Sequence, residues 1–181
     1  FGVRAQWHDR PDTLHLRLAE PFVFGPTRVE AMTVRNMAYD PSLAPAGACV
    51  IQVLMPSDFD FWHDVHHAPQ RYRELKHQLA EQVRRQLERY YPGFAAAEEF
   101  VDVATPYTFW RYARSYRGAY EGWMPTSETI RARVPKTLPG LHGFHMAGQW
   151  VEPGGGVPPA VTSGRQAVQL ACMELGRPFV D

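Results

Sequence analysis

The chain has 181 residues, which is enough for one ordinary domain or for a domain with an appendage. Hydrophobic residues make up 45% of the chain and charged residues 21%, a composition that excludes a disordered or fibrous protein. Nineteen basic and nineteen acidic side chains cancel, so no overall positive field exists to hold nucleic acid or an anionic membrane. The two cysteines do not make a disulfide framework or a zinc site, and they favour a cytoplasmic location.

The first half of the chain predicts an antiparallel sheet. Residues 13–18 alternate apolar and polar side chains, as a half-buried strand does, and a second strand is expected over residues 29–36. Two prolines and a glycine within residues 40–47 predict a turn. The β-branched apolar run at residues 48–55 then predicts a central strand.

The middle of the chain changes to a helical period. Apolar residues recur every three or four positions from residue 72 to residue 90, and a proline–glycine pair follows, so the sequence predicts a long amphipathic helix. Residues 98–104 return to an alternation of apolar and polar side chains, which predicts a strand. A threonine–proline pair can then open a short helix over residues 107–114, because proline is tolerated in a first turn.

The C-terminal part predicts a strand, a glycine-rich loop and a helix. The strand is expected over residues 143–147, the loop over 148–159 and the helix over 160–175, closed by Gly176. Consecutive glycines let a cofactor approach the backbone, and a helix start offers unpaired N–H groups and a positive dipole end. Spacing alone favours a simple turn here, because a glycine-rich loop before a helix is more often only a turn. Neither the Rossmann pattern GxGxxG nor the P-loop pattern GxxxxGK[ST] occurs.

A family resemblance adds to this pattern. Residues 141–167 read LHGFHMAGQWVEPGGGVPPAVTSGRQA, and upstream motifs are DPSLAPAG at residues 40–47, RQLERYYPGF at 85–94, ATPYTFWRY at 104–112 and RGAYEGW at 117–123. Together they resemble the C-terminal portion of the FAD-dependent phytoene desaturase, carotenoid isomerase and retinol saturase group of oxidoreductases. The resemblance covers most of the chain from Met32 onward.

The resemblance implies an α+β architecture divided between two domains of a larger enzyme. Residues 1–140 would be part of a substrate-binding domain built on an antiparallel sheet with packed helices. Residues 141–181 would be a strand, loop and helix that belong to the FAD domain. The chain starts with Phe1 rather than methionine, and the N-terminal Rossmann domain that the resemblance implies is missing from it. That domain of the same protein is therefore an expected partner.

The expected activity is that of the intact protein. FAD would be its cofactor and would not be retained by this part alone, which we expect to be inactive. By flavin hydride transfer the enzyme would desaturate, saturate or isomerise an apolar, isoprenoid or carotenoid-like substrate. The alternative is a non-enzymatic module that binds an apolar ligand or a protein partner. Peripheral membrane contact and a homo-oligomer both stay open, whereas nucleic acid is not expected.

The resemblance also implies a set of residues against FAD: Gly148, Glu152, Gly154, Gly155, Gly156, Val157, Ser163 and Gly164. Related enzymes often carry an acid just after the glycine that ends the strand. Here Gln149 and Trp150 occupy those places, so Glu152 is the expected substitute. No residue is singled out as catalytic, because hydride transfer is the chemistry of the flavin itself.

Two further groups of side chains need an interpretation. His63, His66 and His67 could bind a metal if they lay on a helix, but no cysteine or HExxH pattern accompanies them. We therefore expect a solvated loop and no metal. Arginines alternate with aromatic residues over residues 107–120, and at zero net charge arginines packed over aromatic rings are favoured over binding of single-stranded nucleic acid.

Overall fold

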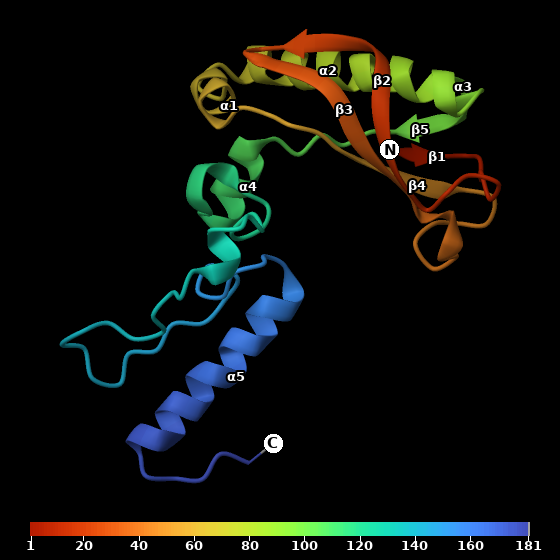
Figure 1. Cartoon of the computed structure of the whole chain (residues 1–181). Coiled ribbons are helices and arrows are strands. Elements are labelled where there is room, and N and C mark those ends of the chain that lie inside the picture. The colour runs from red at the N-terminus through yellow and green to blue at the C-terminus, as the bar shows by residue number, and fades with distance from the viewer. Residues whose placement is uncertain (181) are drawn as a thin grey trace. The chain divides into compact units, whose positions relative to one another are not determined.

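The computed structural model describes residues 1–180 and divides the chain into two compact units, Phe1–Gly118 and Ala119–Asp181. The sheet and most helices belong to the first unit, and the second contains one long helix (Figure 1). The expected division at residue 140 concerns which domain of a larger enzyme each part joins, and it stays a prediction.

The first unit is built on a five-stranded sheet in the order β2-β3-β4-β1-β5. Every neighbouring pair is antiparallel. The strands are β1 (Gly2–Val3), β2 (Thr13–Phe24), β3 (Thr27–Asn36), β4 (Cys49–Leu54) and β5 (Glu98–Phe100). The predicted α+β class, the antiparallel sheet and the central position of the third predicted strand are thereby confirmed. The strand predicted over residues 98–104 is shorter in the structure, where β5 ends at residue 100.

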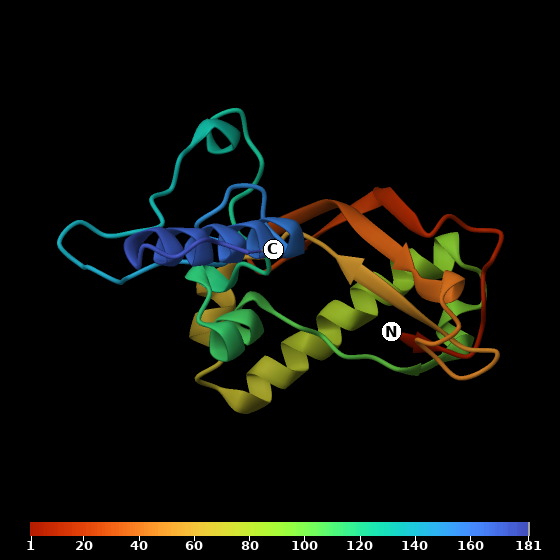
Figure 2. The same cartoon turned by 90° about the horizontal axis from the view of Figure 1, so that it is seen from below.

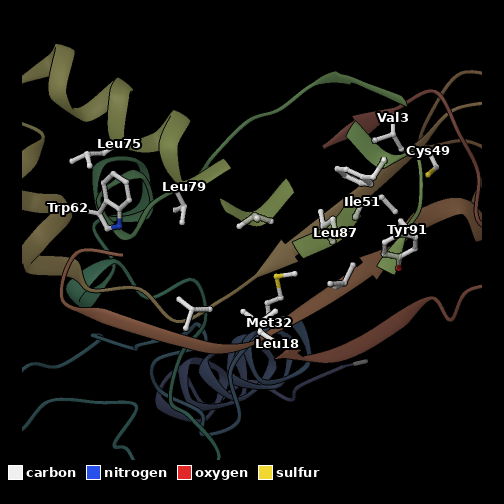
Figure 3. Close-up of a cluster of buried hydrophobic side chains, with 14 residues drawn as sticks. Val3, Leu18, Met32, Cys49, Ile51, Trp62, Leu75, Leu79, Leu87 and Tyr91 are labelled. Carbon is white, nitrogen blue, oxygen red and sulfur yellow. The ribbon is translucent and has the colours of Figure 1, made fainter. Parts of the chain in front are cut away.

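The long predicted helix is α2 (Pro69–Tyr90), which lies along one face of the sheet (Figures 1 and 2). Leu75, Leu79, Val83 and Leu87 are four residues apart, so they share one face of the helix, and all four are buried. Met32 of β3 and Ile51 of β4 are buried in the same cluster of side chains (Figure 3). This layer between helix and sheet is the hydrophobic core.

An ion pair joins the end of the core layer to the edge strand. The guanidinium of Arg84 in α2 binds both carboxylate oxygens of Glu98 in β5, with Nε–Oε2 at 2.5 Å and Nη2–Oε1 at 2.6 Å. Both side chains are largely buried, and the hydrogen bonds to Glu98 raise the pKa of Arg84. Such bidentate geometry fixes β5 against the helix more firmly than a single contact would.

The histidine motif was expected in a loop, and this is only partly correct: His63 lies in a helix, whereas His66 and His67 lie in the turn that follows it. Helix α1 (Phe59–Val65) begins after Asp58, whose Oδ1 accepts a hydrogen bond from the Phe61 amide at 2.7 Å. Its Trp62 is 1% exposed and donates from Nε1 to Ser57 Oγ at 2.8 Å. A capping carboxylate and a buried indole therefore hold a helix that is too short to show a clear period in the sequence.

The short helix predicted over residues 107–114 is present as α4 (Pro106–Ala113). Thr105 and Thr108 form a reciprocal capping box, as the threonine–proline start suggested. The expected stacking of arginines on aromatic rings is confirmed, because Arg114 lies 4.3 Å from the centre of the Trp110 ring. The remaining short elements are α3 (Phe94–Ala97) and the 3-10 turns Met37–Tyr39, Tyr116–Gly118 and Thr129–Arg131.

The second unit contains α5 (Val157–Glu174), which begins three residues earlier than predicted. The strand predicted over residues 143–147 is wrong, since these residues form a turn and irregular chain. Gly143 has φ +70°, outside the extended region, and Met146 makes a backbone hydrogen bond to Lys136 without a strand ladder. Within residues 1–180, no helix has the length and apolar character needed to cross a membrane.

Candidate functional site

The glycine-rich loop before α5 has a backbone that depends on glycine. Gly148, Gly154, Gly155 and Gly156 have φ values of +120°, +121°, +66° and +78°. Gly156 combines its φ with ψ −163°, a region of the Ramachandran plot that is essentially restricted to glycine. The glycines at these positions are therefore required by the path of the chain and do not merely add flexibility.

Two of these glycines have open space where a side chain would be. A Cβ added at Gly148 would meet nothing within 4 Å, and one at Gly156 would reach only Pro158 Cδ at 4.0 Å. A Cβ at Gly155 would lie 3.3 Å from both Glu121 Cβ and the Gly122 nitrogen. The loop thus has a packed side at Gly155 and open positions at Gly148 and Gly156, where a flat group can approach the backbone.

Ser163 connects the beginning of the loop to α5. Its hydroxyl is fully buried, accepts a hydrogen bond from the Gly148 amide at 2.8 Å and lies 2.8 Å from the Ala160 carbonyl oxygen, to which it donates. Ser163 is expected to lie close to the cofactor, and the structure places its hydroxyl beneath the loop. Its contacts make it a positioning residue.

Replacing Ser163 by alanine is expected to loosen this connection. The Gly148 amide would lose its buried acceptor, which typically costs about 1–3 kcal/mol. Hydrogen exchange at the Gly148 amide should therefore become faster. Thr162→Ala changes the exposed neighbour on the same helix and is the matched control. Unchanged exchange in Ser163→Ala would show that the hydroxyl does not hold the loop.

Glu152 is already engaged by a cation. Its Oε2 lies 2.7 Å from Lys136 Nζ, which also donates to the Val151 carbonyl oxygen at 3.2 Å. Both side chains of this pair are mostly buried. The pair fixes the middle of the loop, and one carboxylate oxygen of Glu152 is used in doing so.

The loop has two supports that were not predicted from the sequence. One is Gln149, and the other is the aromatic segment that precedes the loop in the chain. Gln149 Oε1 accepts a hydrogen bond from the Gly156 amide at 3.3 Å and so links the two ends of the loop. Trp123 donates from Nε1 to the Trp150 carbonyl oxygen at 2.8 Å, and the two rings meet edge to face at 5.7 Å. A Cβ on Gly122 would lie only 2.2 Å from the Gln149 carbonyl oxygen. The end of the RGAYEGW motif, residues 121–123, therefore provides the surface on which the loop packs.

The remaining predicted contacts lie on the first turns of α5. Val157 is the first residue of the helix and is exposed, and a Cβ added at Gly164 would meet nothing within 4 Å beyond its own helix backbone. Pro158 and Pro159 fill the next two positions, so two first-turn N–H donors are absent. This helix start is consequently a poor phosphate site, but its open backbone fits the flat ring of a flavin.

Comparison with known proteins identifies the class. A family model described as flavin containing amine oxidoreductase matches residues 4–172, so the chain belongs to this family of FAD-dependent oxidoreductases. Its resemblance to the phytoene desaturase and carotenoid isomerase group is confirmed, and FAD is the cofactor of the intact protein.

Within this family, the chain is similar in sequence to one particular carotenoid enzyme. Over 140 residues the chain is 28% identical to the chloroplastic prolycopene isomerase of Arabidopsis thaliana, an alignment that covers 76% of this chain. The same alignment covers 23% of the plant protein, so the chain spans under a quarter of that relative. No solved structure matches the chain.

Proposed function

We propose that the chain is the C-terminal, substrate-side part of an FAD-dependent enzyme that acts on an apolar, isoprenoid-like polyene. The observation that carries the proposal is the open, glycine-restricted backbone at Gly156, directly before α5. Membership of the flavin-containing family and similarity to a prolycopene isomerase support it. Bound FAD would supply the hydride acceptor and donor.

The loop residues would contact the isoalloxazine end of the cofactor. Gly148 and Gly156 would lie against the ring, because no side chain blocks either position. Ser163, Gln149 and the Lys136–Glu152 pair would hold the loop in place from below. The two prolines of the first turn argue against a pyrophosphate at this point, so phosphate contacts would come from the Rossmann domain.

The same Rossmann domain would cover α5. This helix, all of which the structure describes, buries only Ser163. Val157, Val161, Val168 and Met173 are apolar and exposed. An apolar helix surface of this kind is typical of an interface between domains.

The experiment uses the intact protein. Purified protein is tested for bound flavin by its visible absorption. It is then incubated anaerobically with prolycopene, once with the flavin oxidised, so that it can accept hydride, and once with the flavin reduced, so that it can donate hydride. Chromatography and mass spectrometry separate the outcomes: isomerisation keeps the mass of the carotenoid, whereas desaturation or saturation changes it by pairs of hydrogens. The proposal predicts bound flavin and conversion of the polyene.

Two results would contradict the proposal. Protein without flavin, even after refolding with FAD, would favour the non-enzymatic module that binds an apolar ligand. Flavin-bound protein that oxidises a primary amine with release of hydrogen peroxide, and leaves the carotenoid unchanged, would assign the protein to amine chemistry instead.

A further inference from the structure

Three histidines meet on the surface of the Phe1–Gly118 unit. His63 lies in α1, His66 caps its C-terminus and His67 follows. One ring nitrogen from each lies within 4.8 Å of the others. Tetrahedral zinc with Zn–N bonds of about 2.0–2.1 Å places its nitrogens about 3.4 Å apart, so small side-chain rotations close the set.

The backbone under these histidines is well held. The capping carboxylate of Asp58 fixes the start of α1, and buried Trp62 fixes its inner face. The His66 amide donates to the Trp62 carbonyl oxygen at 3.1 Å, which continues the helical path as far as His66. Residues three apart on a helix share a face, and this condition is met for His63 and His66, while His67 lies in the turn that follows.

The rings are also oriented by their neighbours. The His66 ring stacks on Tyr107 with centroids 3.9 Å apart, and the His63 ring meets Trp110 edge to face at 5.6 Å. Nδ1 of His66 donates to the His63 carbonyl oxygen, which leaves Nε2 as its free nitrogen. A backbone hydrogen bond of this type is what orients a metal-binding imidazole in many sites.

Charges near the cluster do not oppose a cation. Arg117 is paired with Asp60 at 2.6 Å, so its positive charge is locally compensated. The exposed carboxylate of Asp64 lies 3.9 Å from His63 Nδ1 and adds negative charge beside the rings. Arg114 is held over the Trp110 ring by a cation–π contact.

We propose that His63, His66 and His67 form a binding site for a divalent transition metal, with zinc as the expected ion. Imidazole nitrogens suit zinc, whereas magnesium and calcium require oxygen ligands. Three protein ligands leave the fourth tetrahedral position to water or to another donor. The ion would clamp the end of α1 to the chain that enters α2, and it would do so independently of the flavin.

The test is calorimetric titration of the full chain, freed of metal, with zinc chloride. One zinc ion per chain is expected. His63→Gln and His67→Gln should each weaken binding at least about tenfold, because even changes in the outer shell of a metal-bound histidine cost that much. His77→Gln is the control, since His77 is an exposed histidine on α2 outside the cluster.

A second measurement reports the geometry. Cobalt(II) in a tetrahedral site absorbs visible light strongly, and this absorption should disappear in His67→Gln, whose exposed side chain leaves the fold unchanged by circular dichroism. The proposal is overturned if zinc shows no saturable binding or if binding requires millimolar zinc concentrations. It is also overturned if His77→Gln weakens zinc binding as much as the cluster variants do.

Discussion

In the intact enzyme, Gly156→Val is expected to lower flavin occupancy sharply. The backbone at Gly156 lies in a region that is essentially restricted to glycine, and a strained residue of this kind costs about 1–3 kcal/mol. A valine would also put branched bulk where the open space lies. Converted at 1.4 kcal/mol per factor of ten, backbone strain alone weakens FAD binding by about 5- to 140-fold. Flavin absorbance per protein after gel filtration measures the effect.

Two matched variants separate strain from bulk. Gly156→Ala has the same backbone penalty with less volume, so a further loss from alanine to valine reports contact with the ring. Gly176→Val introduces valine at another glycine of positive φ, just beyond the opposite end of α5, and should retain flavin. Full flavin content and unchanged turnover in Gly156→Val would show that the loop is only a turn.

Local patterns in the sequence were sufficient for most of the first unit. The helix α2 was predicted because its apolar period persists for over five turns and a proline–glycine pair ends it. Strand β2 was predicted from apolar–polar alternation, β3 from a strand-like run, and β4 from the β-branched apolar run that follows the predicted turn. Helix α1 was missed because seven residues show less than two full periods, although Asp58 as a capping residue was a usable signal.

Only part of the candidate site could be predicted from the sequence. The glycine run marks the loop, since glycine is needed wherever φ is positive. The contacts that support the loop join residues far apart in the chain, such as Gly148 with Ser163 and Trp123 with Trp150. No pattern in one sequence predicts such pairs. The strand expected over residues 143–147 failed because alternation cannot supply a neighbouring strand, which a ladder of hydrogen bonds requires.

The aromatic end of the core offers the largest expected effect on stability. Phe94 is fully buried at the start of α3. Its ring meets Phe1 edge to face at 5.3 Å and stacks on Trp7 at 5.9 Å. Tyr91, also fully buried, is 6.4 Å away. The ring thus fills space between segments that are distant in the sequence, and local rearrangement cannot replace it.

Phe94→Ala is therefore expected to lower the free energy of unfolding by about 3–5 kcal/mol, the usual cost of removing a buried phenylalanine side chain and leaving a cavity. Phe100→Ala is the matched control, because this phenylalanine lies in the same unit but is 63% exposed. Its loss should cost about 1 kcal/mol or less, as most surface substitutions do. Urea unfolding followed by tryptophan fluorescence measures both variants. Equal losses in the two would mean that the ring of Phe94 is not packed as the structure has it, since burial is the property that distinguishes them.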